Sequence, residues 1–278
     1  MWIICIIAFF VAATIVFFRV PYSITKNSFQ NDVQSNKNTD ISQSEVFSEQ
    51  DIALLPEPIQ NYFRVCGYIG KPQMATMTSY ITSATLKDSD KSKPMIVDYT
   101  WVSFAHEPVR LAYIESSMYG IPFEAYDSLQ NGVGFMKGVI GKVITLFDQR
   151  GPAMDKAQLL TYLGECFIIP SSVLTDYITW EYIDADHVKA TITYKEISGS
   201  GIFTFDDKGF VEFFHTDERA RIGADGKVDY PTWLCLYENY SDKNGIFYPE
   251  SIKAVWRDES GDFVYFAADN VTFTFQTE

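Results

Sequence analysis

Glu165 is the carboxylate whose position best suits chemistry. It shares one face of an expected helix with Thr161 and Tyr162, away from the leucine stripe of that segment. If the helix covers the mouth of a cavity, Glu165 points inward and needs a partner, because an unpaired buried charge is costly. Arg219, in a charged stretch of a long strand, is the expected partner. Glu165 and Arg219 are therefore the candidate catalytic residues, and their pair is either structural or a general acid or base at a raised pKa.

No other catalytic or metal-binding pattern is present in the sequence. His106, His187 and His215 follow neither His-x-x-x-His nor His-Glu-x-x-His spacing. The sequence also lacks a Gly-x-Ser-x-Gly elbow, a P-loop and a dinucleotide fingerprint. We therefore expect neither a metal nor a cofactor.

Aromatic side chains supply a second type of candidate site. The chain of 278 residues contains 22 Phe, 17 Tyr and 5 Trp. Aromatic residues favour strands and fill cores, but some of them can line an apolar ligand cavity instead. The candidate ligand-binding residues, spread over separate expected elements, are Trp101, Asp127, Tyr162, Trp180 and Trp233.

The N-terminal segment from Met1 to Phe18 carries no charged side chain. A helix of about 20 residues, at about 1.5 Å per residue, crosses a hydrocarbon layer of about 30 Å. No Lys or Arg precedes the run, and its small-residue cleavage candidate, Val11-Ala12-Ala13, lies inside it. These features favour an uncleaved single-span anchor over a cleaved signal peptide.

The basic residues that follow this span bear on its orientation. Arg19 and Lys26, read literally by the positive-inside rule, place the rest of the chain in the cytoplasm. A large domain can be translocated despite such a small bias, and the cysteines show no disulfide pattern that decides the compartment. We expect a single-pass membrane protein with an extracytoplasmic domain, an orientation that these counts leave open.

Composition divides the chain into three segments. We expect a transmembrane anchor at 1–18, a flexible polar linker at 19–50 and a single β-rich domain at 51–278. The linker is rich in Asn, Ser, Gln and Asp, so it can bury little apolar surface. The net charge of −14 argues against nucleic acid as a partner. The expected partners are the membrane, through the N-terminal helix, and a lipid or other apolar small molecule.

Two helices and a series of strands are expected within the domain. The first helix starts at the prolines Pro56 and Pro58 and ends at Gly67, and the second is capped by Asp155 and halted by Pro170. Asp, Asn and Gly turns, spaced about ten residues apart, predict an antiparallel meander. Its expected strands are 74–86, 95–104, 109–116, 122–128, 133–137, 178–183, 187–195, 201–205, 210–221, 227–240, 247–256 and 262–275.

These elements predict a fold of the α+β class that is mostly β. We expect one large curved antiparallel sheet, an open half-barrel, with the two helices packed on its concave face and one transmembrane helix before it. Such a sheet forms an apolar trough that can hold a ligand. By analogy, this architecture resembles that of LolA and LppX, curved-sheet carriers of the periplasm, and an analogy of fold says little about function.

Several strings carry a resemblance to a known family. They are Leu55-Pro56-Glu57-Pro58-Ile59 with Tyr62-Phe63-Arg64, Asp127 with Gly132-Val133-Gly134-Phe135-Met136, Leu160-Thr161-Tyr162-Leu163-Gly164-Glu165 with Pro170, Trp180-Glu181, Phe205-Asp206 and Arg219. In this order they resemble the bacterial domain-of-unknown-function family DUF6920, formerly DUF6544. The family prefers Arg-Tyr-Leu and Ala-Glu where this chain has Thr161 and Gly164. The resemblance implies no mechanism, because no activity is established for the family.

The sequence supports three hypotheses of function. The preferred one is a membrane-anchored binding module that holds a lipid or another apolar ligand in the trough of the sheet. The first alternative is an enzyme that uses Glu165, with Arg219 or Asp127, on a small or lipid-like substrate. The second is an interaction or scaffold domain with an exposed sheet face. The absence of a catalytic motif favours binding over catalysis.

Overall fold

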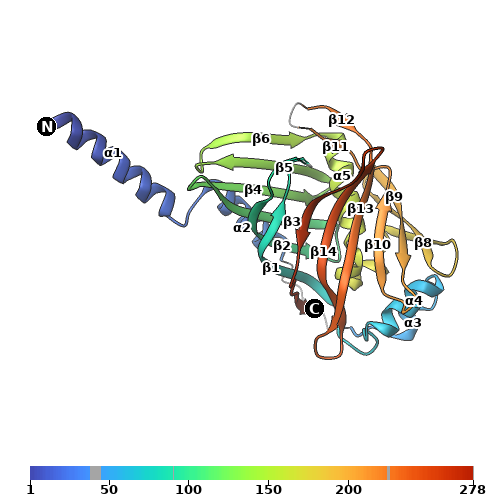
Figure 1. The fold of residues 1–278 in the computed structure, drawn as a ribbon. Helices are drawn as coiled ribbons and strands as arrows, with labels where there is room; N and C mark the ends of the chain where they lie inside the picture. Colours follow the sequence, from blue (N-terminus) through green and yellow to red (C-terminus); the bar gives the residue numbers. More distant parts are fainter. Residues whose placement is uncertain (38–44, 90, 224–225, 278) are drawn as a thin grey trace.

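The computed structural model describes residues 1–37, 45–89, 91–223 and 226–277 (Figure 1). Its centre is one antiparallel sheet of fourteen strands. The fold is α+β and mostly β, as the turn pattern predicted, with an apolar helix before the sheet.

The first six strands form the N-terminal half-sheet, in which neighbours in sequence are neighbours in space. Its strands are β1 (Met74–Leu86), β2 (Met95–Phe104), β3 (Val109–Met118), β4 (Ile121–Gln130), β5 (Val133–Ile140) and β6 (Ile144–Arg150). The expected strands at 74–86 and 95–104 are confirmed at both ends. β6 was not predicted, because its largely exposed side chains lack the apolar alternation of a half-buried strand.

The C-terminal half-sheet contains seven strands in the order β15-β14-β13-β10-β9-β8-β7. They are β7 (Ile178–Tyr182), β8 (His187–Tyr194), β9 (Ile197–Phe205), β10 (Val211–Thr216), β13 (Thr232–Asp242), β14 (Phe247–Asp258) and β15 (Gly261–Ala268). A short hairpin of β11 (Arg221–Ile222) and β12 (Val228–Asp229) lies outside the large sheet.

Three expected strands are interrupted. The strand expected at 210–221 ends at Thr216, and the one expected at 227–240 breaks at Pro231, which has no N–H for a ladder bond. The strand expected at 262–275 turns near Asn270, whose φ is +56°. It continues as β16 (Thr274–Thr277), which pairs with the start of β1.

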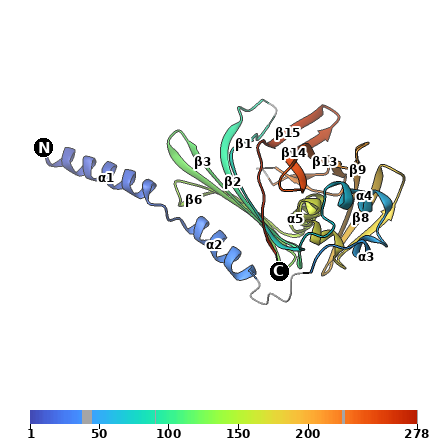
Figure 2. The same cartoon turned by 90° about the horizontal axis from the view of Figure 1, so that it is seen from below.

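The two half-sheets meet at β1. Only Thr85 and Leu86, at the end of β1, pair with β15. Beyond this short seam the half-sheets diverge and enclose the helix α5 (Pro152–Gly164) on the concave side (Figure 2). Nine of the residues of α5 are buried, because the helix has sheet on both sides.

The start of α5 differs from the prediction. Gly151 is the N-cap and Pro152 occupies the first turn, where the missing N–H of proline is harmless. Asp155, the expected cap, lies within the helix, and its carboxylate accepts the Gly134 N–H at 2.7 Å. The residue thus ties α5 to β5.

Two further helices precede β1. α3 (Glu49–Ile52) begins with a capping box between Ser48 and Asp51. α4 (Glu57–Val65) packs on the same side of the sheet as α5, where the Tyr62 hydroxyl donates to the Phe167 carbonyl at 3.0 Å. Phe167 belongs to the first of two short 3-10 helices, Cys166–Ile168 and Pro170–Leu174, that follow α5.

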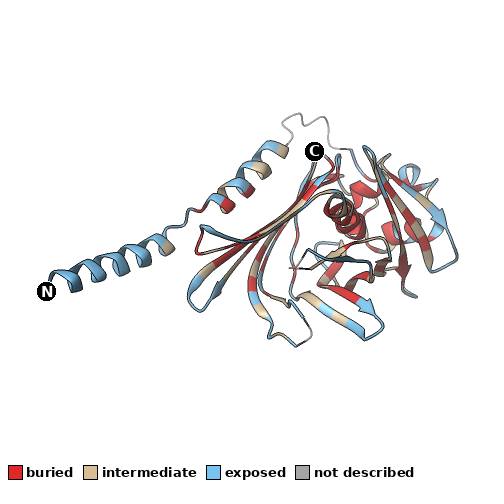
Figure 3. Cartoon of the chain, turned by 90° about the horizontal axis from the view of Figure 1, so that it is seen from above, coloured by how far each residue is buried: buried red, intermediate tan, exposed pale blue. Residues whose placement is uncertain are grey.

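The linker expected at 19–50 is not a coil throughout. α2 (Ile24–Asn36) packs on the convex face of β3 and β4, where Phe29 stacks on Tyr113 with 5.5 Å between ring centroids (Figure 3). Polar composition predicted a coil, but one aromatic residue docks the helix because β3 presents aromatic surface to it. Phe47 is also buried, so the folded part begins before residue 51. Residues 38–44 of the expected linker lie outside the described ranges.

The first helix, α1 (Trp2–Arg19), buries none of its residues. Among the helices of the described ranges, α1 is the one that is long and apolar enough to cross a membrane. The Nζ atom of Lys142, in the β5–β6 turn, donates to the Phe17 carbonyl at 3.1 Å and also to the Val20 carbonyl. This lysine fastens the end of α1 to the sheet.

Candidate functional site

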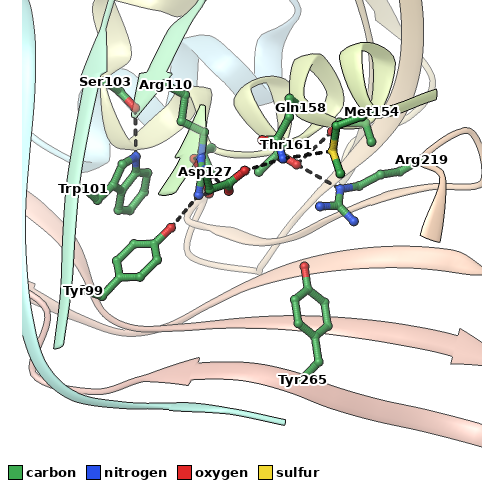
Figure 4. A network of polar contacts seen from close by, with 12 residues as sticks. Tyr99, Trp101, Ser103, Arg110, Asp127, Met154, Gln158, Thr161, Arg219 and Tyr265 are labelled. Atoms are coloured by element: carbon green, nitrogen blue, oxygen red, sulfur yellow. Dashed lines mark hydrogen bonds and ion pairs between the residues drawn. The ribbon is translucent and has the colours of Figure 1, made fainter. Parts of the chain in front are cut away.

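A cavity of about 760 Å³ lies on the concave side, between the half-sheets and α5. Apolar side chains form much of its wall, among them Ile81, Ile114, Met136, Ile252, Phe263 and Phe266. The turns β1–β2 and β14–β15 contribute residues at its rim, including Ser89 and Ser260. Charged and amide side chains gather where α5 meets β3 and β4 (Figure 4). We call this polar group, Arg110, Asp127, Gln158 and Glu165, the floor cluster.

Strand alternation places Arg110 in the cavity. Successive residues of a strand point to opposite faces, so Arg110 and Ile114 face the cavity while Tyr113 faces α2. Because both faces are covered, every residue from Val109 to Ile114 is buried. Arg110 is the charged residue of this run, and its charge must be compensated within the protein.

The Arg110 guanidinium binds three partners. Its Nε lies 2.5 Å from Glu165 Oε2, and its Nη2 lies 3.0 Å from Oε1 of the same carboxylate. Its Nη1 donates to Asp127 Oδ2 at 2.7 Å, and its Nη2 also donates to the Tyr99 hydroxyl at 2.8 Å. The Arg110 side chain is only 5% exposed, against 12% for Glu165 and 14% for Asp127. One buried cation thus holds two carboxylates.

Burial and charge act in opposite directions on these pKa values. Burial disfavours the Arg110 guanidinium, but Glu165, Tyr99 and Asp127 outweigh it, so the pKa of Arg110 lies well above its ordinary value. For Glu165, burial dominates over the nearby Arg110 and raises the pKa of the carboxyl. The cluster therefore contains a permanently charged arginine and a carboxyl that is easier to protonate than usual.

Within the floor cluster, Gln158 connects α5 to Asp127 of β4. Its Nε2 donates to Asp127 Oδ1 at 2.5 Å, while its Oε1 is buried without a hydrogen-bond partner in the described ranges. The close approach of α5 depends on Gly134, where an added Cβ would lie 2.8 Å from the Met154 carbonyl oxygen and from Gln158 Cγ. Glycine at this position lets the helix bring Gln158 to the carboxylate.

Glu165 pairs with Arg110 rather than with the expected Arg219. Arg219 reaches the cavity from the loop after β10, and its Nε donates to Thr161 Oγ1 at 2.9 Å. Its guanidinium carbon lies 4.6 Å from the Trp233 ring centroid and 4.9 Å from that of Trp256. Arg219 still acts on Glu165 through its charge, which lowers the pKa of that carboxyl against the larger effect of burial.

The other candidate residues divide into two groups. Trp101, Asp127 and Trp233 line the cavity, as do Glu165 and Arg219. Tyr162, in the core, and Trp180, half-buried against the core, do not line it. Gln158, Thr161 and Glu165 follow one another at spacings of three and four, so they share the cavity face of α5. Tyr162 comes directly after Thr161 and is therefore rotated from it by about 100° around the helix axis.

The Tyr162 hydroxyl donates instead to the Phe104 carbonyl at 2.8 Å. The Trp180 indole donates to the Val173 carbonyl at 3.0 Å and packs on Phe167. Both residues therefore support the core behind α5.

Sequence reasoning missed several residues of the site. They are Tyr99, Arg110, Gln158 and Tyr265, all of which line the cavity. Arg110 carried a usable signal, because it is the lone charge in a run of otherwise apolar strand residues from Val109 to Ile114. A charge in a strand covered on both faces must have a buried partner. In the described ranges, no group of three or more His, Cys, Asp or Glu side chains is placed to hold a metal ion.

Comparisons with known proteins identify the family. No curated protein matches the sequence. Among solved structures, the LolA superfamily protein NE2245 from Nitrosomonas europaea is similar over 79% of this chain and 94% of its own, with 12% sequence identity and a TM-score of 0.41. The model of DUF6544, a family of unknown function, matches residues 45–268, so the chain belongs to this family.

Proposed function

We propose that this protein is a membrane-attached module that binds a lipid or another apolar ligand in the cavity between its half-sheets. The observation that carries the proposal is the cavity of about 760 Å³, whose lining combines a large apolar wall with the floor cluster and further charged side chains. Small-molecule sites typically have volumes of about 300–1,000 Å³ and this type of lining. A concave apolar surface of this size is unusual in a protein without a ligand, because apolar surface is normally buried on folding.

The floor cluster supports binding over catalysis. Both oxygens of Glu165 accept from Arg110, and the two oxygens of Asp127 accept from Arg110 and Gln158. A general acid or base must reach a proton of the substrate, whereas each of these four oxygens already accepts one hydrogen bond within the protein. The cluster joins β3, β4 and α5 and so holds the cavity open. An enzyme using Glu165 is the second candidate, on the strength of the raised pKa of its carboxyl.

We propose that α1 attaches the protein to the membrane as a permanent single-span anchor. The domain then lies on the extracytoplasmic side. Its end is fastened to the β5–β6 turn by Lys142. Exposed apolar side chains gather at this turn and the neighbouring β3–β4 turn, namely Met118, Tyr119, Ile121, Val143, Ile144 and Leu146. We call these six residues the apolar tips. Phe147, in the same strand β6, lines the cavity, so the tips and the cavity are parts of one edge of the sheet.

Lipid extraction tests the proposal. The full chain is purified from membranes, and the lipid bound per protein is measured by mass spectrometry for the wild type and two variants. Ala254→Trp places a large side chain in the cavity, whereas Val264→Trp places the same side chain on the exposed face of β15. All three proteins carry the same lipid around α1. A difference in the amount of bound lipid between them therefore comes from the cavity. We expect Ala254→Trp to lose a lipid that the wild type and Val264→Trp retain, and equal amounts in all three would contradict the proposal.

A further inference from the structure

Arg219 differs from the other arginines of the folded domain in its surroundings. Those that have a carboxylate within ion-pair distance are Arg64, Arg110, Arg150, Arg221 and Arg257. Within the described ranges, Arg219 has none, although the chain contains 36 acidic and 22 basic residues. A cation that lines an apolar cavity without a carboxylate partner is costly unless another group compensates it.

The position of Arg219 is fixed by its neighbours. Its guanidinium lies over Trp233 and Trp256, and its Nε is held by the Thr161 hydroxyl. Stacking on indole rings restricts the planar fork and leaves its terminal amino groups as donors. Neither terminal amino group has a hydrogen-bond acceptor in the part of the chain that the structure describes. The half-buried arginine is therefore oriented, with terminal amino groups that can donate to a ligand.

Tyr265 adds a second donor beside Arg219. Its hydroxyl oxygen accepts the Trp233 indole N–H at 2.9 Å, so the hydroxyl hydrogen remains to be donated. Figure 4 shows this hydroxyl pointing toward the Arg219 side chain. Burial raises the pKa of Tyr265 and the Arg219 charge partly opposes this, as expected for two groups that face each other. Arg219 and Tyr265 thus present donors to the same part of the cavity, and such donors suit an anion with several acceptor oxygens.

The carboxylates of the floor cluster do not compete for these donors. All four oxygens of Asp127 and Glu165 are bonded to Arg110 or Gln158. Phe266, the residue after Tyr265 in the chain, and Ile252 line the same cavity with apolar side chains. An anionic head at Arg219 would thus continue into a chain along an apolar surface.

From this arrangement we infer that the ligand is an anionic amphiphile, whose carboxylate or phosphate head binds Arg219 and Tyr265 and whose acyl chain lies along the apolar wall. The inference rests on the proposed function and specifies the ligand class. An Arg–carboxylate or Arg–phosphate contact is charge-assisted and stronger than a neutral hydrogen bond. The head at Arg219 would select the ligand, and the wall would supply affinity.

Competition among three probes tests the inference. The full chain, released from non-ionic detergent, is incubated with palmitate, 1-palmitoyl lysophosphatidate and hexadecanol, and occupancy is measured by native mass spectrometry. We expect the wild type to prefer one or both anions over hexadecanol by about 10- to 100-fold, the range for loss of a charge-assisted hydrogen bond. The two anions distinguish a carboxylate site from a phosphate site.

Two arginine variants provide the matched comparison. Arg219→Gln should lose the preference for the anions while it retains hexadecanol, and Arg219→Lys should keep part of the preference. Arg257→Gln removes the same charge from an exposed residue that does not line the cavity and is paired with Asp262, and it should behave as the wild type. The preference of the wild type tests the anionic head, and binding of hexadecanol by Arg219→Gln shows that this variant is folded. An unchanged preference for the anions in Arg219→Gln would overturn the assignment of the head to Arg219.

The remaining outcomes separate this inference from the proposed function. Equal binding of the three probes by the wild type would overturn the anionic head and leave the apolar site intact. Binding of none of them would overturn both. Inorganic phosphate is added as a fourth probe, and its binding at Arg219 without that of any amphiphile would show a small-anion site and contradict the inference.

Discussion

Arg110 and Glu165 connect the start of β3 to the C-terminal end of α5 by a two-point contact, with Nε 2.5 Å from Oε2 and Nη2 3.0 Å from Oε1. The contact is buried, and the two residues are 55 positions apart in the chain. Since Asp127 of β4 shares the same guanidinium, the three residues fix α5 against the N-terminal half-sheet. The floor of the cavity is therefore also a structural joint of the fold.

Replacement of Arg110 should be severely destabilising. In Arg110→Met, Glu165 and Asp127 remain buried without their cation, and loss of one partner of a buried pair costs about 3–5 kcal/mol. Urea unfolding followed by tryptophan fluorescence measures the change. Arg257→Met is the control, because its partner Asp262 is exposed and such pairs contribute about 1 kcal/mol or less. The triple variant Arg110→Met, Asp127→Asn, Glu165→Gln should recover much of the loss, and failure of Arg110→Met to destabilise more than Arg257→Met would refute the role.

His215 should make stability depend on pH near neutrality. Burial lowers its pKa below the ordinary value, and its Nδ1 is buried without a hydrogen-bond partner in the described ranges. The folded state therefore binds fewer protons than the unfolded state between the two pKa values, so this stabilisation is present above about pH 6.5 and is lost as the pH falls.

The free energy of unfolding, measured from pH 7.5 to pH 5.5, should fall less in His215→Gln than in the wild type. His106→Gln is the matched control, because that residue is exposed and is not among the charges that act on His215. An identical fall in His215→Gln and the wild type would show that His215 does not couple folding to pH.

α2 should detach on its own when its aromatic contact is removed. Phe29 stacks on Tyr113 and contacts the edge of Tyr126, and truncation of a buried Phe typically costs about 3–5 kcal/mol. In Phe29→Ala, the amides of α2 should exchange with deuterium about 100-fold faster or more, while those of β13 and β14 stay protected. Gln30→Ala, which changes an exposed residue of the same helix, should leave the exchange of α2 unchanged. A uniform loss of protection in Phe29→Ala would mean that α2 is part of the global fold.

The apolar tips should lie in the membrane surface. In nanodiscs of acyl-brominated phosphatidylcholine, tryptophan emission added by Tyr119→Trp should be quenched, because bromine acts at short range. Tyr182→Trp, also exposed but on β7 at the far edge of the sheet, should add unquenched emission. The wild-type signal, which includes Trp2 of α1, is subtracted in both cases. Equal quenching at the two positions would contradict the proposed placement.

Local patterns determined much of the architecture. β1 and β2 were predicted at their ends because alternation and turn residues act within a few positions, and α1 because its composition alone suits a bilayer. The resemblance of the chain to its family was likewise readable from short strings, and the family match confirms it. Glu165 and Asp127 stood out as carboxylates of interest, and both line the cavity.

Other features depended on distant segments. α2 docks because β3 offers Tyr113 to Phe29, which the polar composition of residues 24–36 does not reveal. Arg219 does not form an ion pair with Glu165, because β10 ends at Thr216 and the arginine lies in the following loop. From there it contacts Thr161 and Trp233 instead. The partner of Glu165 depends on which strands lie beside α5. The order of strands in a sheet is not a local property of the sequence, so this partner could not be predicted from it.

The sequence by itself thus determined the type of the elements, the apolar N-terminal helix and the interest of the carboxylates Glu165 and Asp127. Only the tertiary structure decided that Arg110 holds those carboxylates and that Arg219 is left without one beside an apolar wall. The reason is physical: hydrophobic periodicity and turn chemistry act over a few residues, whereas charge pairing and cavity shape arise between residues that folding brings together.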